Sequence, residues 1–279
     1  MLRRVSPEAL DELTQHDAAA VASRRDLQRI HKVMGSAAIT QQALQRMTVS
    51  TPKNRPLRVL ELGAGDGSLM LAVAESLWPT WPCVHLSMLD RVPLLKADTA
   101  RRFAALGWTA SNKISDVLDW AKEPEADVRR SGSGSSNEMR FDVIVSHLFL
   151  HHFEGEELNS VLRAAARRCD HFFACEPRRA PLALAASHLV GALGANAVTR
   201  GDAVLSVHAG FREQELSDAW DSVAAGWHLQ ERGAGWFSHC FVAERYRPSQ
   251  RPSQRPIHRP SPRSSPLSQR AAPPPQAAS

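Results

Sequence analysis

The chain has 279 residues, of which 43% are hydrophobic and 23% charged, and its formal net charge is +5. This composition excludes a wholly disordered, fibrous or small disulfide-stapled protein and allows a sizeable core. Residues 247–279 contain six arginines and no lysine or acid, so the remaining residues carry 28 − 29 = −1. The basic pI therefore belongs to the tail, and the body gives no strong signal for nucleic-acid binding.

The four cysteines are scattered and form no C-x-x-C pair (Cys83, Cys169, Cys175, Cys240). This spacing favours reduced, mostly buried thiols in a cytoplasmic protein. The N-terminal segment lacks the apolar run of a signal peptide. The most apolar stretch, 181–198, is short and interrupted by polar residues, so no membrane span is expected.

Residues 1–50 are expected to form a helical cap segment. Ser6 would cap a first helix that has Pro7 at its first position. Asp26 would open a second helix, and Gly35 would end it.

From residue 57 onward, apolar runs typical of strands alternate with helical patterns. Strands are predicted at 57–62, 84–90, within 108–114, 141–150, 171–176, 227–231 and 236–245. Helices are predicted after the first two strands and at 156–168, 181–194 and 213–223. This order predicts a doubly wound α/β sheet over residues 51–246, ending in an antiparallel hairpin.

Two segments differ from the rest in composition. Residues 122–140 are charged and rich in Gly and Ser, which predicts a flexible loop. Residues 247–279 repeat the pattern R-P-S-Q and contain 9 of the 18 prolines, which predicts a disordered tail. Such a tail could contact a peptide-binding domain through polyproline recognition.

The most informative segment joins a buried strand to a helix through three glycines: Glu61, Leu62, Gly63, Ala64, Gly65, Asp66, Gly67. Glycines allow the tight turn and let a ligand approach the backbone. A dinucleotide loop would read G-x-G-x-x-G, but here Ser68 stands at the third glycine position, which disfavours an NAD-dependent oxidoreductase. The carboxylate of Glu61 would repel a phosphate and attract an ammonium group.

This segment resembles motif I of the class I S-adenosylmethionine-dependent methyltransferases, and the order of the later strands is similar over about residues 26–246. The resemblance implies a seven-stranded Rossmann-like sheet with an antiparallel last strand, and S-adenosyl-L-methionine as the cofactor. It implies that Asp90 binds the ribose hydroxyls and that Asp116 and Val117 contact the adenine. The full implied cofactor-binding set is Glu61, Gly63, Ala64, Gly65, Gly67, Asp90, Arg91, Asp116, Val117 and His147.

Several of these positions have other interpretations. Asp116 competes with Asp119, and either could be an exposed helix cap. Trp120 could cover the adenine or belong to the core. Arg29 and Met34 could close over the cofactor or lie on a plain surface helix.

The segment 141–153 resembles the fourth-strand motif of small-molecule methyltransferases of the quinone-biosynthesis type. The resemblance places His147 beside the methionine part of the cofactor and His151 and His152 near the methyl-transfer site. One of these two could be a general base for a phenol, whose pKa is about 10. A structural role for either is the alternative, and the sequence does not choose between them. No metal site is expected, because no convergent carboxylates accompany the histidines.

The acceptor is expected to be a small hydrophobic or phenolic molecule, because the insert at about 177–212 is mostly apolar. The segments 196–200 and 206–212 are interpreted as loops that carry polar groups, and Trp236 and His239 lie on the last hairpin. The alternatives are methylation of protein or RNA, with the tail recruiting an acidic partner, and a non-catalytic binding module that uses the tail.

Overall fold

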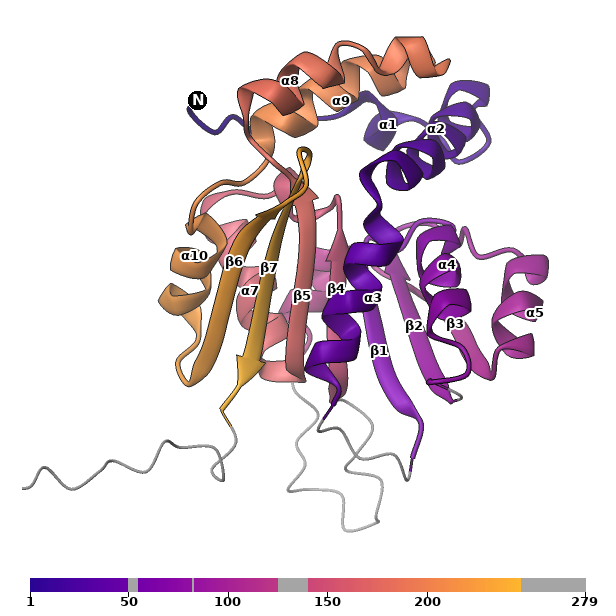
Figure 1. Ribbon diagram of the computed structural model, residues 1–279, viewed down its shortest axis with the longest axis vertical. Helices are drawn as coiled ribbons and strands as arrows, with labels where there is room; N and C mark the ends of the chain where they lie inside the picture. The colour runs from indigo at the N-terminus through magenta and orange to yellow at the C-terminus, as the bar shows by residue number, and fades with distance from the viewer. Residues whose placement is uncertain (50–54, 82, 125–139, 247–279) are drawn as a thin grey trace, which may run out of the picture. The chain divides into compact units, whose positions relative to one another are not determined.

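Seven strands form one mixed sheet in the order β3-β2-β1-β4-β5-β7-β6 (Figure 1). The computed structural model describes residues 1–49, 55–81, 83–124 and 140–246. The strands are β1 (Leu57–Leu62), β2 (Val84–Asp90), β3 (Trp108–Ile114), β4 (Phe141–His147), β5 (Cys169–Pro177), β6 (Trp227–Ala234) and β7 (Ser238–Arg245). Among these strands, β7 runs in the opposite direction to the other six, so its pairs with β5 and β6 are antiparallel. The predicted doubly wound sheet with an antiparallel last strand is confirmed.

Helices cover both faces of the sheet and one of its edges (Figure 1). One face carries α3 (Ser36–Met47), α4 (Ser68–Leu77) and α5 (Ala97–Ala105), and the other carries α6 (Val117–Lys122), α7 (Gly155–Arg168) and α10 (Glu215–Val223). Over the carboxyl ends of the parallel strands lie α1 (Ala9–Glu12), α2 (Ala18–Met34), α8 (Pro181–Ser187) and α9 (Ala197–Ala209). Two short 3₁₀ turns, η1 (Leu150–His152) and η2 (Val190–Leu193), lie at the same edge.

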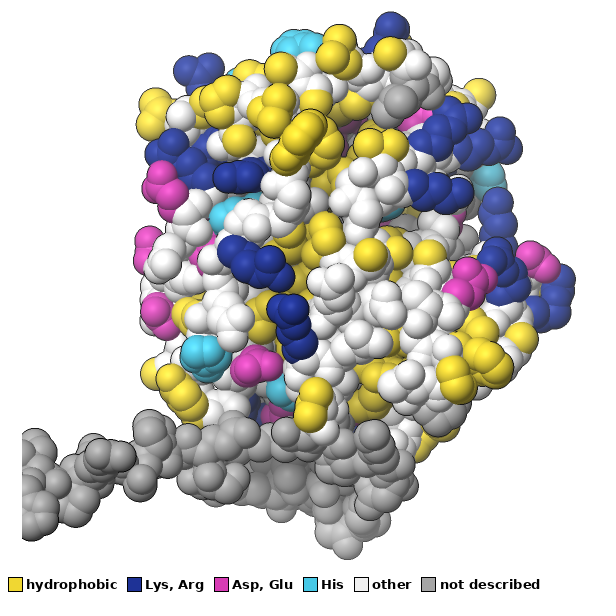
Figure 2. Space-filling model, viewed as in Figure 1, with side chains coloured by type: hydrophobic (Ala, Val, Ile, Leu, Met, Phe, Trp, Pro, Cys, Tyr) yellow, Lys and Arg dark blue, Asp and Glu magenta, His cyan; other side chains and the backbone are white. Residues whose placement is uncertain are grey.

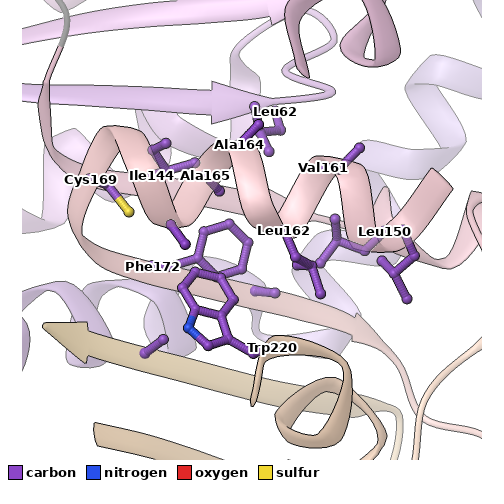
Figure 3. Packing of buried hydrophobic residues seen from close by; sticks show 14 of the residues in the cluster. Leu62, Ile144, Leu150, Val161, Leu162, Ala164, Ala165, Cys169, Phe172 and Trp220 are labelled. Carbon is purple, nitrogen blue, oxygen red and sulfur yellow. The ribbon is translucent and has the colours of Figure 1, made fainter. Parts of the chain in front are cut away.

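The central strands are apolar on both faces because helices cover both. In β5, Phe172 packs toward α7 and α10, whereas the next residue, Phe173, packs toward α3 and α4. Figure 3 shows Phe172 beside Trp220 of α10 and under the apolar side of α7. Their ring centroids lie 5.0 Å apart. Strand alternation thus divides the core into two layers.

The N-terminal helices begin at other residues than predicted. The first, α1, starts at Ala9, beyond Ser6 and Pro7, and has four residues. The second starts at Ala18, because the Asp17 carboxylate accepts the N–H groups of the first turn. Gly35 ends α2 in the left-handed conformation, as predicted, with φ +66°.

Asp26 lies inside α2 and does not open it. Its buried carboxylate accepts the backbone N–H of Asn196 at 2.9 Å and the Thr199 hydroxyl at 3.2 Å. A tertiary contact with a distant segment therefore explains an acidic residue that local signals assigned to a helix start.

Three further predictions differ from the structure. Residues 197–209, part of the predicted loops, form α9, whose first turn is capped by the Asn196 side chain. The helix predicted at 181–194 ends at Ser187 and is followed by η2. Strand β4 ends at His147, not at residue 150. The Leu148 N–H still bonds to Cys175 O of β5, but the next three N–H groups bind the Glu176 carboxylate instead of continuing the ladder.

Most of the predicted loop at 122–140 and all of the predicted tail at 247–279 lie outside the described residues. Within the described ranges, no helix has both the length and the apolar character needed to cross a membrane.

We expect Phe172→Ala to lower the free energy of unfolding by about 3–5 kcal/mol, because it leaves a cavity between β5, α7 and α10. Urea unfolding followed by tryptophan fluorescence measures this loss. Trp236→Ala is the matched control: this side chain is 67% exposed, and its loss should cost less than about 0.5 kcal/mol. Similar costs for the two variants would contradict the packing described here.

Candidate active site

A cavity of about 540 Å³ opens at the carboxyl ends of β1 and β4, beneath α2, α8 and α9. Of the ten residues in the implied cofactor-binding set and the two candidate bases, seven line it: Glu61, Gly63, Ala64, Gly65, His147, His151 and His152. The other five do not: Gly67, Asp90, Arg91, Asp116 and Val117. The structure therefore brings the glycine turn and the three histidines together around one space.

The glycine turn adopts a backbone that side chains would obstruct. Gly63, Gly65 and Gly67 have φ values of +65°, +56° and +74°. A Cβ atom at Gly63 would lie 2.3 Å from the Phe149 ring, and one at Gly67 would lie 2.7 Å from the Met88 methyl group. Nothing lies within 4 Å of the corresponding position at Gly65. Two glycines thus allow close packing, and Gly65 borders open space where a ligand could approach.

Glu61 and His147 form a buried polar pair at the base of the cavity. Glu61 Oε1 lies 3.5 Å from His147 Nδ1, and both side chains are 3% exposed. Burial, followed by the charges of Asp66 and Asp90, raises the pKa of Glu61 well above its ordinary value. Burial lowers the pKa of His147 to about 4. Burial thus disfavours the charged form of both groups, which opposes an ion pair between them.

Thr40 fixes the tautomer of His147. The Thr40 hydroxyl donates to Ser36 O at 2.8 Å, so it can only accept from His147 Nε2, which lies 2.8 Å away. Nδ1 of the neutral ring is then an unprotonated acceptor. Within the described part of the chain, neither this Nδ1 nor Glu61 Oε2 has a hydrogen-bond partner. Two buried polar atoms thus remain unsatisfied beside the glycine turn.

Asp90 lies at the carboxyl end of β2 and is bonded to the glycine turn. Its Oδ2 accepts the Gly65 N–H at 2.9 Å, and its Oδ1 accepts the Val92 N–H at 3.0 Å. The Asp90 carbonyl accepts the N–H of Ser115 at 3.0 Å, which brings the end of β3 alongside. Each carboxylate oxygen keeps a further lone pair for a ligand hydroxyl.

Asp116 is the helix cap at this edge. Its side chain accepts the Leu118 N–H at 2.7 Å and starts α6. Its rival Asp119 is bonded instead to Lys122 in the same helix. Val117 and Trp120 are buried in the core, and Arg168 lies over the Trp120 ring. Trp120 therefore has the core role that was its alternative.

The remaining residues selected on the cofactor side lie apart from one another. The exposed Arg91 pairs with Asp11 at 3.0 Å. Arg29 pairs with Asp26 at 2.9 Å on the surface of α2, whereas Met34 lines the cavity.

His151 is held between two carboxylates. Its Nδ1 lies 2.9 Å from Glu176 Oε2 and its Nε2 lies 3.3 Å from Glu8 Oε1. Burial opposes a charge on the ring, but the hydrogen bonds and charges of Glu176 and Glu8 outweigh it and raise the pKa of His151 to about 9. In this conformation His151 is a buried imidazolium.

His152 is less constrained than its neighbour. Its ring lies against that of His151, with centroids 4.4 Å apart, and its side chain is 20% exposed. Its Nδ1 lies 3.2 Å from Asp11 Oδ2, and its Nε2 lies 4.0 Å from Glu8 Oε2.

Glu8, His151 and His152 offer ligand atoms that all lie within 4.8 Å of one another, a spacing that a metal ion could use. A proton on His151, shared between Glu8 and Glu176, already balances part of the negative charge here. The expectation that the site needs no metal remains a prediction.

Glu176 and Glu8 are functional residues that the sequence patterns do not predict. Glu176 is completely buried, and its position at the end of a strand, just before Pro177, is a signal that could have singled it out. Glu8 comes from the N-terminal segment, 143 residues from its partner His151, and no local pattern points to it.

The acceptor-side residues are only partly placed as expected. The insert supplies Ala183, Val190 and Val207 to the cavity wall, and Phe237 comes from the hairpin. His239 does not reach the cavity: it is buried and bonded to Glu231 at 2.7 Å. Figure 2 shows hydrophobic side chains gathered over α8 and α9.

The model of the methyltransferase-domain family matches residues 60–199, half of the chain. The chain belongs to this family. The resemblance to class I methyltransferases, drawn from Glu61 to Gly67, is confirmed. No curated protein matches the chain.

Solved methyltransferases share the fold. The plantazolicin methyltransferase BpumL in complex with SAH has a TM-score of 0.57 and 11% identity, covering 83% of this chain and 92% of that chain. BpumL with a monoazolic desmethylPZN analog and SAH has a TM-score of 0.52 and 11% identity, covering 80% and 90%.

The raised pKa of His151 makes its contribution to stability depend on pH. A histidine charged in the folded state stabilises it fully below the unfolded pKa of 6.5, and this stabilisation disappears as pH rises through the folded value of about 9. We expect the difference in free energy of unfolding between the native protein and His151→Gln to narrow by roughly 3 kcal/mol between pH 6 and pH 10.

Thermal unfolding across this pH range measures the change. His228→Gln, at an exposed position on β6, is the control and should show no such narrowing. A constant difference for His151→Gln would mean that the ring is neutral in the folded protein.

Proposed function

We propose that this protein transfers a methyl group from S-adenosyl-L-methionine to a small hydrophobic or phenolic acceptor. The observation that carries the proposal is the unsatisfied, buried Glu61 carboxyl group beside a glycine turn that borders open space. Membership of the methyltransferase-domain family supports the reaction type. The BpumL structures, which were solved in complex with SAH, support the cofactor.

The residues present fit the cofactor at its amino-acid end. The free Oε2 of Glu61 and the free Nδ1 of His147 are both acceptors, and an ammonium group supplies three donors. Gly63, Ala64 and Gly65 would border the ligand, and Asp90 would accept from its hydroxyl groups. Asp116 and Val117 would lie toward the base. When bound, the cofactor supplies an electrophilic methyl group on a sulfonium, and the protein mainly aligns the acceptor with it.

The wall opposite Glu61 supports a hydrophobic acceptor. Leu27, Ile30 and Met34 of α2 and Val190 and Val207 from the insert face the cavity. An apolar wall with a few polar groups orients a small molecule while excluding water. The protein's location in the cytoplasm is part of the same proposal, because the buried thiols of Cys169, Cys175 and Cys240 suit a reducing compartment.

Between the two histidines, we favour His151 as the general base. Glu176 is bonded to Nδ1 and so orients Nε2, whereas His152 is partly exposed and bonded to Asp11. A base held in this way takes the acceptor's proton on Nε2 and shares the resulting charge with Glu176. Before it can act as a base, Nε2 must lose the proton that it shares with Glu8.

Binding of S-adenosylhomocysteine, which keeps the ammonium group, tests the cofactor site. An ammonium beside Glu61 lowers the raised pKa of this carboxyl group, so binding should release protons to the buffer at a pH between the pKa values of the free and the bound carboxyl group. Calorimetric titration in two buffers of different ionisation enthalpy measures this release.

Glu61→Gln should abolish the proton release and weaken the Kd by roughly 10- to 100-fold, the worth of a hydrogen bond to a charged group. Glu75→Gln, at an exposed position on α4, is the matched control and should change neither quantity. Failure of the native protein to bind S-adenosylhomocysteine would refute the proposed function.

Turnover with radiolabelled methyl donor and a panel of phenolic acceptors tests the base. His151→Ala should reduce kcat by about 10²–10⁴-fold, because the acceptor then loses its proton without assistance. His152→Ala should have the smaller effect. The reverse order would assign the base to His152, and unchanged rates in both variants would eliminate base catalysis at this position.

A further inference from the structure

The first thirteen residues, 1–13, cross the acceptor side of the cavity, and we call them the N-terminal strap. Glu8, Leu10 and Asp11 of the strap line the cavity. The Asp202 carboxylate of α9 accepts the N–H groups of Ala9 at 2.8 Å and Leu10 at 3.0 Å. The strap therefore forms part of the cavity wall and is bound to α9, and we call this its closed arrangement.

A second set of polar contacts fastens the start of the strap. The Arg3 guanidinium donates to Ala209 O and to Phe153 O, each at 2.8 Å, and the Arg4 N–H donates to His208 O at 3.1 Å. None of the strap residues, all of which the structure describes, is fully buried. Polar contacts without a buried apolar anchor allow a segment to open locally while the core stays intact.

Glu8 is the strap residue that reaches the catalytic ring. Its Oε1 lies 3.3 Å from His151 Nε2 and accepts the Ser206 hydroxyl at 2.5 Å, and its side chain is 12% exposed. Nε2 is the nitrogen that Glu176 leaves available to the acceptor. The strap carboxylate thus occupies the place where an acceptor oxygen would have to lie to give up its proton.

We propose that Glu8 keeps His151 protonated while the N-terminal strap is closed, so that the base becomes available only when the strap lifts or an acceptor displaces Glu8. With a carboxylate on each ring nitrogen, both nitrogens must donate, and a ring that donates twice has no lone pair for a substrate proton. Glu8 is therefore a positioning residue that controls the charge of the base. The proposal rests on the proposed function only in treating His151 as that base.

The charged groups around His151 agree with this assignment. Glu176 faces it from β5 and Glu8 from the strap, while His152 stacks on it from η1. Arg3 is the nearby cation and donates to the His151 carbonyl at 3.3 Å, not to its ring. Asp202 of α9 is the next acidic group. Burial and the charges of Glu8 and Asp11 raise the pKa of Asp202, although its hydrogen bonds to the Ala9 and Leu10 N–H groups oppose this shift. The two carboxylates on the ring therefore dominate its charge.

A direct titration of His151 tests the proposal without an acceptor. The full-length protein is labelled with ¹⁵N-histidine, and the His151 ring signals are assigned from their loss in His151→Gln. In the native protein we expect His151 to titrate near pH 9. In Glu8→Gln, which keeps the size of the side chain but not its charge, the titration should move down by about one to three pH units.

Glu12→Gln is the matched control, because Glu12 is an exposed acid on the same short helix, α1. It should leave the His151 titration unchanged. Ser206→Ala, which removes only the hydroxyl that holds Glu8, is a second variant and should move the titration in the same direction by a smaller amount. An unchanged titration in both Glu8→Gln and Ser206→Ala would overturn the proposal.

Turnover separates this proposal from the proposed function. Once an acceptor is known, the rising limb of the kcat–pH profile should move to lower pH in Glu8→Gln, so that the variant is faster than the native protein at pH 7. A shifted titration without methyl transfer to any acceptor would sink the proposed function alone. Methyl transfer with an unshifted titration would sink the charge control alone.

Discussion

The buried carboxylate of Glu176, at the carboxyl end of β5, is the group around which the site is organised. It accepts backbone N–H groups from Phe149, Leu150 and His151 and binds the His151 ring as well. A completely buried anion is costly unless it is fully hydrogen-bonded, and these bonds meet that requirement. The same bonds end β4 at His147 and turn the chain so that His151 faces the cavity. Leu148 takes a positive φ of 47° within this turn, a strained backbone that the surrounding bonds impose.

The site contains two histidines of opposite electrostatic character a few residues apart. His147 is completely buried, and this burial lowers its pKa to about 4. His151 is equally buried, but its two charged carboxylate partners outweigh burial and raise its pKa to about 9. Burial alone does not decide the charge of a histidine; the charges that burial brings next to it do. The neutral end suits a cationic ligand group, and the charged end suits an acceptor that must lose a proton.

Local sequence patterns predicted the parts of the fold that depend on interactions between residues close in the sequence. The glycine turn, the buried strands and Gly35 at the end of α2 follow from backbone conformation and alternation, which a short window of sequence contains. The role of Asp26 was predicted wrongly because its partners, Asn196 and Thr199, lie 170 and 173 residues later in the sequence. The sequence predicts loops where α9 forms, because the apolar residues of this helix do not follow a single stripe. The contact of Glu8 with His151 could not be predicted, since it depends on how the strap closes.

Burial disfavours charge on both Glu61 and His147, and this bears on how the proposed enzyme would exchange its cofactor. An ammonium group that enters would favour the charged form of Glu61, which burial otherwise disfavours. Methyl transfer discharges the sulfonium but leaves the ammonium untouched, so Glu61 would grip the spent cofactor as firmly as the fresh one. The demethylated product should therefore compete with the methyl donor for this part of the pocket. Any preference for the donor must arise from contacts around the sulfur.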